Sequence, residues 1–199
     1  MVAVLLTACA PSPSPGSSAQ PGSQPGSQPS PQPGGPPGRG SRGDDPAPDP
    51  APSDPVADAF VAAHNHFRAN VSPAADPPLP PVAWSPELAA EAQAWADRCN
   101  FEHSETDHGE NLSARTNATD PRETVEAWAS EAEHFDHRKN RCASGAVCGH
   151  YTQLVWRAST KIGCGVARCS SNSPFGGGAW VLTVCNYDPA GNWRGEKPY

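Results

Sequence analysis

Three segments of the chain carry apolar residues at helical spacing behind an N-terminal capping signal. The first runs from Val56 to about Ala69 and follows Ser53 or Asp54 as the N-cap, with Pro55 in the first turn. Proline is favoured there because the first helical N–H groups have no partner within the helix. The residues on its apolar face are Phe60, Val61, His64 and Phe67. The spacing therefore predicts a helix over 56–69.

A second and a third segment carry the same signals. Ser85 and Pro86 start the second segment, whose apolar face comprises Leu88, Ala89, Ala92, Trp95, Ala96 and Cys99. Asp120 and Pro121 start the third, whose inward residues are Val125, Trp128, Ala132 and Phe135. Both starts are typical of helix N-termini. Glu131 follows Trp128 by three residues, which brings it near the same face of the predicted helix.

Two later segments are rich in residues that favour strands. Ile162–Ala167 and Ala179–Tyr187 are separated by Ser, Asn, Pro and Gly, a pattern typical of a hairpin. Helices interleaved with antiparallel strands predict an α+β fold, namely a three-layer α/β/α sandwich with an antiparallel central sheet.

The hydrophobic pattern is missing from the N-terminal quarter of the chain. Between Ala10 and Asp54 nearly every residue is Pro, Gly, Ser, Gln, Ala or Asp, and no aliphatic side chain is larger than that of Ala. Such a segment buries too little apolar surface to offset the entropy of ordering. We expect a disordered linker over 10–54 and one folded domain over 55–199, since about 145 residues suffice for one core.

Charge narrows the range of partners. The net charge of the chain is −7 at pH 7, and the sequence shows no clustered basic face. Nucleic acid is therefore not an expected partner, because neutralising its phosphates requires such a face. We expect a monomer.

Seven cysteines indicate an oxidising compartment. Six of them lie in the predicted domain: Cys99, Cys142, Cys148, Cys164, Cys169 and Cys185. An even number of cysteines in one domain predicts three disulfides. A zinc–thiolate site is the alternative, and the absence of any Cys-x-x-Cys spacing disfavours it.

Cys9 stands apart from these six. It follows the apolar run 2–6, and the sequence Leu6-Thr7-Ala8-Cys9 resembles a bacterial lipobox, in which the cysteine is lipidated after cleavage. We expect residues 1–9 to be a truncated lipoprotein signal peptide and Cys9 to be the membrane anchor, with the outer membrane favoured in a Gram-negative host. A chance cysteine before a disordered tail is the alternative, since the apolar run is short and no Lys or Arg precedes it.

Two long motifs resemble the signatures of a known family. Residues 149–159 (GHYTQLVWRAS) and 185–193 (CNYDPAGNW) are similar to the first and second signatures of the CAP superfamily. That superfamily comprises cysteine-rich secretory proteins, venom antigen 5 proteins and class 1 plant pathogenesis-related proteins. Shorter matches precede the motifs in the expected order: His64-Asn65, Arg68, Trp84, residues 99–104 (CNFEHS), residues 109–112 (GENL), Trp128 and Glu131. The plant pathogenesis-related branch is the most similar.

The resemblance implies a site as well as a fold. In CAP domains a cavity is lined by two histidines and two glutamates, and the matching positions here are His103, Glu110, Glu131 and His150. The disulfide pairs that the plant branch implies are Cys99–Cys169, Cys142–Cys148 and Cys164–Cys185. Proximity in the sequence independently supports the pair Cys142–Cys148.

The chemistry of these four residues allows three interpretations. Two imidazoles and two carboxylates suit a divalent cation such as Zn²⁺, with His103 and His150 as nitrogen ligands and the glutamates orienting them. Glu110 or Glu131 could instead act as a general base in metal-dependent hydrolysis, although the helical His-Glu-x-x-His pattern is missing. In the third interpretation the four residues form a satisfied polar network without a ligand.

These observations favour a secreted or surface-anchored binding protein that is not an enzyme. The expected ligand is a lipid, a sterol-like molecule or a peptide, and this expectation rests on the resemblance alone. The alternatives are a metal-dependent hydrolase acting on peptides or cell-envelope polymers, and a structural adhesin of the envelope.

Overall fold

The computed structural model describes residues 4–7, 54–117 and 120–199, which belong to one structural unit of the chain. This range covers the predicted domain except for two residues of one loop. The predicted lipidation site Cys9 and the predicted linker, apart from Asp54, lie outside the described residues. Both therefore stay predictions.

The three helices begin where the capping residues predict. They are α1 (Pro55–Ala69), α2 (Pro86–Ala96) and α3 (Pro121–Ala129). The side chains of Asp54, Ser85 and Asp120 accept hydrogen bonds from main-chain N–H groups of the first turns. The third helical segment tightens after α3 into the 3₁₀ helix η1 (Ser130–His134). Glu131 is consequently on η1, where it is buried as its spacing from Trp128 suggested.

The predicted hairpin is the centre of the sheet. It consists of β6 (Lys161–Cys169) and β7 (Trp180–Asp188), which run antiparallel. The strand order is β1-β3-β7-β6-β2, with β3 (Gly109–Arg115) antiparallel to β7 and β1 (Val4–Thr7) antiparallel to β3. A separate small ribbon pairs β4 (Phe135–Asp136) with β5 (Arg141–Cys142).

The sheet departs in one detail from the purely antiparallel prediction. The two-residue strand β2 (Ala83–Trp84) pairs parallel to β6, so the sheet is mixed. A strand of two residues has no alternation that a pattern could detect. The pairing of β2 with β6 fixes the main chain directly before Ser85, the N-cap of α2.

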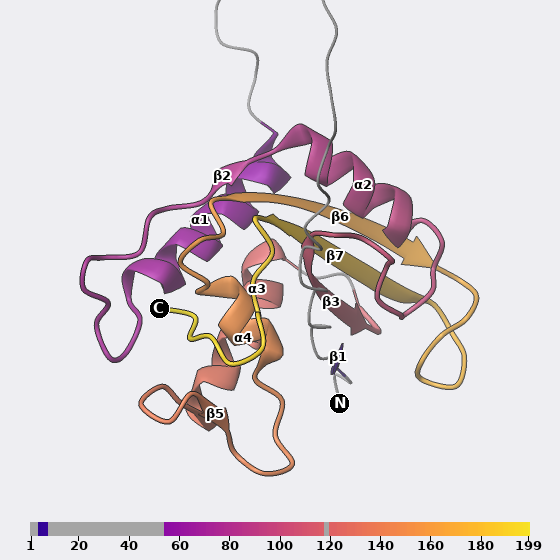
Figure 1. The fold of residues 1–199 in the computed structure, drawn as a ribbon. Helices are drawn as coiled ribbons and strands as arrows, with labels where there is room; N and C mark the ends of the chain where they lie inside the picture. Colours follow the sequence, from indigo (N-terminus) through magenta and orange to yellow (C-terminus); the bar gives the residue numbers. More distant parts are fainter. Residues whose placement is uncertain (1–3, 8–53, 118–119) are drawn as a thin grey trace, which may run out of the picture. The chain divides into compact units, whose positions relative to one another are not determined.

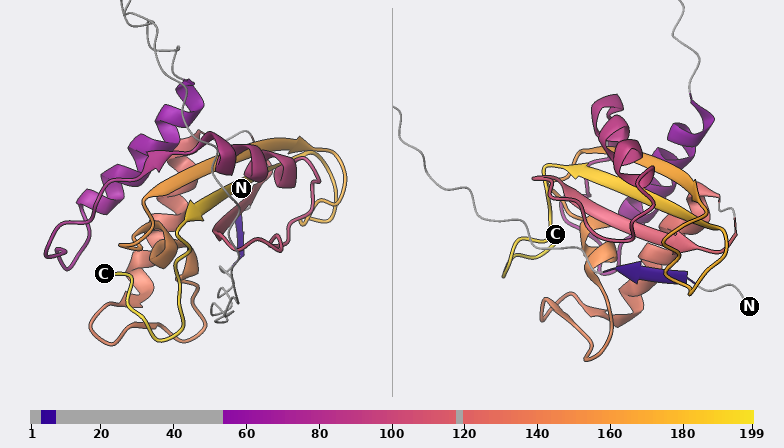
Figure 2. Two further views of the ribbon diagram at one scale, coloured as in Figure 1. Left: turned by 45° about the horizontal axis from the view of Figure 1, so that its top comes forward. Right: turned by 90° about the vertical axis from the view of Figure 1, so that its right-hand side faces the viewer.

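The helices cover both faces of the sheet, as Figures 1 and 2 show. Helix α2 packs on one face, where Ala92 and Ala96 contact Leu182 and Val184 of β7. Helices α1, α3 and α4 (Gly149–Leu154) pack on the other face. The core of that second face contains Phe60, Val125, Trp128, Leu154, Ile162, Cys185 and Tyr187. The fold is therefore the predicted three-layer sandwich.

Three disulfides join the described cysteines. The pairs are Cys99–Cys169, Cys142–Cys148 and Cys164–Cys185, which are those implied by the resemblance. Cys164 and Cys185 are direct neighbours across the central hairpin. The short loop closed by Cys142 and Cys148 leads directly into α4.

Candidate functional site

His150 and Glu131 form a buried pair between α4 and η1. The Nδ1 atom of His150 lies 2.6 Å from Oε1 of Glu131. The main-chain N–H groups of His150 and Tyr151 donate to Oε2 of the same carboxylate at 3.0 and 3.1 Å. Both oxygens of Glu131 are thus engaged. Because a carboxylate accepts hydrogen bonds, Nδ1 of His150 carries a proton, and in the neutral imidazole Nε2 is then an acceptor.

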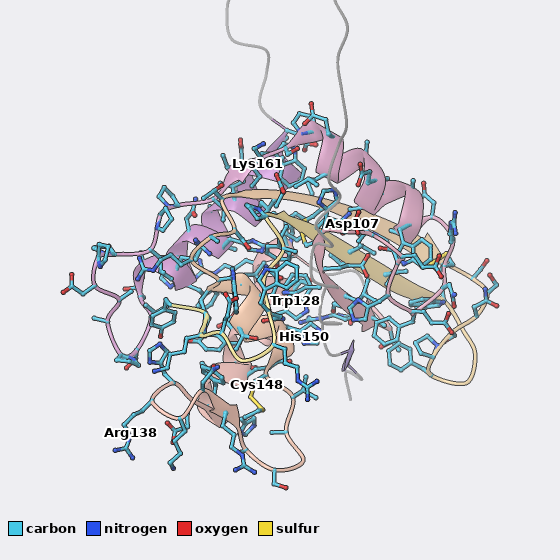
Figure 3. All side chains as sticks on the ribbon, in the orientation of Figure 1. Asp107, Trp128, Arg138, Cys148, His150 and Lys161 are labelled. Atoms are coloured by element: carbon cyan, nitrogen blue, oxygen red, sulfur yellow. A yellow bond between two sulfur atoms is a disulfide. The ribbon has the colours of Figure 1, made fainter. Side chains whose placement is uncertain are left out.

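The second ring nitrogen of His150 has no such contact. The side chain of His150 is fully buried, and its Nε2 atom has no hydrogen-bond partner among the described residues. The indole ring of Trp128 lies against the imidazole, with ring centroids 6.1 Å apart and ring planes 8° from parallel. Figure 3 shows these two labelled side chains next to each other, above Cys148. A buried acceptor without a donor is uncommon and indicates a place for a ligand.

His103 and Glu110 form a second pair of the same kind. Nδ1 of His103 lies 2.7 Å from Oε1 of Glu110, and the main-chain N–H of Ser104 donates to that same oxygen at 2.9 Å. The hydroxyl of Ser104 donates to Oε2. Glu110 is buried, whereas the side chain of His103 keeps 16% of its surface exposed. Ser104 therefore helps to hold the Glu110 carboxylate in place.

Strand β3 connects the two pairs. Glu110 and Asn111 are consecutive residues, so their side chains leave opposite faces of the strand. Glu110 holds His103, while Nδ2 of Asn111 donates to the main-chain oxygen of His150 at 3.1 Å and to the Tyr187 hydroxyl at 3.0 Å. A single segment of main chain thus fixes both histidines.

His64 extends this network into α1. Its Nδ1 lies 2.7 Å from the main-chain oxygen of Phe60, and its Nε2 lies 2.9 Å from the hydroxyl of Tyr187. Burial lowers the pKa of His64 to about 4, with a smaller contribution from the nearby charge of Arg68. The sequence placed His64 on an apolar helix face and among the shorter matches to the CAP family, and gave it no role. A histidine at a core-facing position was the one signal of this contact.

The structure places the four predicted residues in two pairs, His103 with Glu110 and His150 with Glu131. No group of three or more His, Cys, Asp or Glu side chains able to hold a metal ion occurs within residues 4–7, 54–117 and 120–199. The two imidazoles and two carboxylates nevertheless include the nitrogen and oxygen donors that a divalent cation such as Zn²⁺ accepts. Each imidazole is held through Nδ1 by a carboxylate, the arrangement that orients histidine ligands in metal sites.

Comparison with known proteins shows the family to which this chain belongs. Residues 61–187 match the model of the CAP family, described as the cysteine-rich secretory protein family. The chain belongs to this family. Pathogenesis-related protein 1A of Nicotiana tabacum is 41% identical over 145 residues, which cover 70% of this chain and 79% of the tobacco protein. Pathogenesis-related leaf protein 4 of Solanum lycopersicum is 41% identical over 144 residues, which cover 70% of this chain and 81% of the tomato protein.

Solved structures share the fold. Venom allergen-like protein 4 of Schistosoma mansoni superposes with a TM-score of 0.59 at 24% identity, over 74% of this chain and 95% of the schistosome protein. The hookworm platelet inhibitor superposes with a TM-score of 0.56 at 22% identity, over 74% of this chain and 76% of the inhibitor. Among the described residues, no helix combines the length and apolar character needed to span a membrane.

Proposed function

We propose that this CAP domain is a binding module, not an enzyme, and that its two carboxylate-held histidines bind a divalent cation such as Zn²⁺. The observation that carries the proposal is the buried Nε2 of His150, which has no hydrogen-bond partner among the described residues. Glu131 fixes the proton on Nδ1 of the same ring. Neutral imidazole with a free Nε2 is the form in which histidine binds metals.

His103 is the second nitrogen ligand in this proposal. Glu110 holds its Nδ1 as Glu131 holds that of His150. Two imidazole ligands leave coordination positions for water or for an atom of a ligand. Affinity for the ion is consequently modest.

The state of the glutamates supports binding over hydrolysis. A general base must have an oxygen within reach of the attacking water. In Glu131 one oxygen faces His150 and the other accepts two main-chain N–H groups. In Glu110 both oxygens accept hydrogen bonds from His103 or Ser104. Taking up a proton from water would require either carboxylate to give up contacts that hold its histidine.

An organic ligand completes the proposal. A cavity of about 340 Å³ lies beside the Cys142–Cys148 loop. Its aromatic lining residues are Phe135, Trp156 and Trp193. An aromatic lining of this kind suits the apolar part of a lipid, a sterol-like molecule or a peptide. We further propose secretion to the cell envelope or the extracellular space, with Cys9 as the lipid anchor.

Calorimetric titration of the oxidised protein with Zn²⁺ tests the metal site. We expect binding by the parent protein and at least a tenfold loss of affinity in His103→Ala and in His150→Ala, because each removes one of two nitrogen ligands. His134→Ala is the matched control, since His134 is an exposed histidine of η1 and its loss should leave affinity unchanged. Equal binding by all four proteins would refute the proposal.

The hydrolase alternative has its own assay. Glu110→Gln and Glu131→Gln are compared with the parent protein on casein and on peptidoglycan. We expect no turnover by any of the three proteins. Zinc-dependent turnover by the parent that both substitutions abolish would replace the binding proposal with catalysis.

A further inference from the structure

A second cavity lies on the α2 side of the sheet. Its volume is about 690 Å³, and it is lined by α2, by the segment that follows α2 and by one residue of β7. Its lining residues include Trp95, Glu91, Arg98, Glu102, Glu105 and Asn186. A volume of this size is typical of pockets for small organic ligands.

Asn186 forms the end of this pocket that belongs to the sheet. On β7 it continues the row of Leu182 and Val184, whose side chains pack against α2. Asn186 is only 3% exposed, and its Oδ1 atom has no hydrogen-bond partner among the described residues. Leaving a buried amide oxygen without a donor costs free energy. The lining of the pocket therefore includes a residue whose buried amide oxygen lacks an N–H or O–H donor.

Charge selects the kind of donor. Three lining side chains are carboxylates, Glu91, Glu102 and Glu105, and the one lining guanidinium is that of Arg98. Arg98 lies over the ring of Trp95, with its guanidinium carbon 4.6 Å from the ring centroid. Glu91 also contacts Nε2 of His108 at 3.3 Å. Carboxylates outnumber the lining cation, so the pocket favours a cationic ligand over an anionic one.

The spacing of these carboxylates disfavours a compact ion. No three His, Cys, Asp or Glu side chains of the described segments are placed to hold a metal. An elongated ligand can instead place one cationic group near Asn186 and the carboxylates and extend its chain away from them. Ala94 and Trp95 offer apolar surface for that chain. An alkyl chain can pack against this apolar surface.

We propose that this pocket binds an alkyl chain ending in a primary ammonium group. The ammonium donates to Oδ1 of Asn186, and the carboxylates of Glu102 and Glu105 supply the opposite charge. His103 is one of its lining residues, but binding of the ammonium group requires no metal. Binding in the presence of a chelator therefore distinguishes this site from the zinc site.

Calorimetry of the parent protein with cadaverine, in chelator and at low salt, tests this site. Two matched ligands separate the contributions of charge and of N–H donors. Pentane-1,5-bis(trimethylammonium) keeps both charges of cadaverine and lacks N–H groups, and 1,5-pentanediol lacks the charges. We expect cadaverine to bind at least tenfold more tightly than either. Equal binding of cadaverine and either matched ligand would overturn the proposal.

Two sets of variants locate the binding. Asn186→Leu keeps the side-chain volume and removes the acceptor, so affinity for cadaverine should fall about tenfold. The thermal midpoint of Asn186→Leu should be equal to or above that of the parent, because the substitution removes an unpartnered buried amide. The double variant Glu102→Gln and Glu105→Gln should weaken binding about fivefold. The exposed Glu126 of α3 is the matched control, and Glu126→Gln should change affinity less than twofold. A loss in Glu126→Gln equal to that in the double variant would refute the pocket.

One further arm identifies the source of the ammonium group. Nα-acetyl-lysine methylamide carries the same ammonium as cadaverine on a peptide unit. Tighter binding of the lysine derivative supports a lysine-bearing peptide as the natural ligand, and tighter binding of cadaverine supports a free diamine. Failure of both to bind the parent protein would overturn the proposal.

Discussion

His64 shows how a single buried side chain couples the stability of this domain to pH. The imidazole is fully buried and hydrogen-bonded on both nitrogens. Burial lowers its pKa from the ordinary value of 6.5 to about 4. Between these two values the unfolded chain binds more protons than the folded protein. The contribution of His64 to the free energy of unfolding is therefore fully present above pH 6.5 and is lost as the pH falls towards 4.

We expect the free energy of unfolding to fall by about 3 kcal/mol between pH 7 and pH 4 because of His64. Urea unfolding at the two pH values measures it. His64→Gln should be less stable than the parent at pH 7 and should show a pH dependence smaller by about that amount. His66→Gln, on the exposed side of the same helix, should keep the full dependence of the parent. A His64→Gln variant with the pH dependence of the parent would show that another group is responsible.

At this scale the sequence predicted identities but not contacts. The motifs predicted His103, Glu110, Glu131 and His150 as cavity residues, which stays a prediction, and the structure adds which glutamate holds which histidine. That pairing depends on how η1, α4 and β3 pack, and local spacing does not encode it. The roles of Asn111 and Asn186 were also not predicted, because an asparagine within a motif has no distinguishing signal until its hydrogen bonds are known.

Among the elements, those with local signals were predicted and those set by tertiary contacts were not. The three helices with Asp or Ser caps and a first-turn proline begin where predicted. Helix α4 has six residues and no side-chain cap, so nothing local marks its start. All seven residues of β3 are buried, which removes the alternation of polar and apolar residues by which a half-exposed strand is recognised.

The contact between α2 and β6 depends on two glycines of the strand. A Cβ atom at Gly165 would lie 2.3 Å from Cα of Gln93, and one at Gly163 would lie 2.1 Å from the main-chain nitrogen of Ala89. These neighbours are main-chain atoms, which cannot rotate away. The glycines therefore set the distance between the helix and the sheet.

Gly165→Ala should consequently destabilise the domain by about 2 to 3 kcal/mol, because α2 must shift away from the sheet. Val166→Ala, at the adjacent and partly exposed position of the same strand, should cost less than about 1 kcal/mol. Chemical denaturation of both variants measures the difference. Equal stability of Gly165→Ala and the parent would mean that the space between α2 and β6 can accommodate a Cβ atom at this position.

For the whole molecule, the disulfides distribute stability unevenly. Cys99–Cys169 spans 70 residues of sequence, Cys164–Cys185 spans 21 and Cys142–Cys148 spans 6. In the chain-entropy account, a cross-link that closes a longer loop restricts the unfolded chain more. The disulfide Cys99–Cys169 should therefore contribute most.

Paired alanine substitutions test this order. Replacing Cys99 and Cys169 by Ala should lower the free energy of unfolding by about 4 kcal/mol, and replacing Cys142 and Cys148 by about 2 kcal/mol. Denaturant titration under oxidising conditions measures both losses. A larger loss for the short loop would show that the Cys142–Cys148 bridge acts through the folded state, by supporting α4, and not through the unfolded chain.

The connection through β3 has a consequence for the domain as a whole. Glu110 holds His103, which lines the α2 pocket, and Asn111 donates a hydrogen bond to the main chain at His150. A displacement of this strand therefore moves both histidines. If an occupant of the α2 pocket alters the affinity of His150 for an ion, thermodynamic reciprocity requires that the ion alter the affinity for that occupant by the same factor. Strand β3 would then couple the binding of the ion to the occupancy of the α2 pocket.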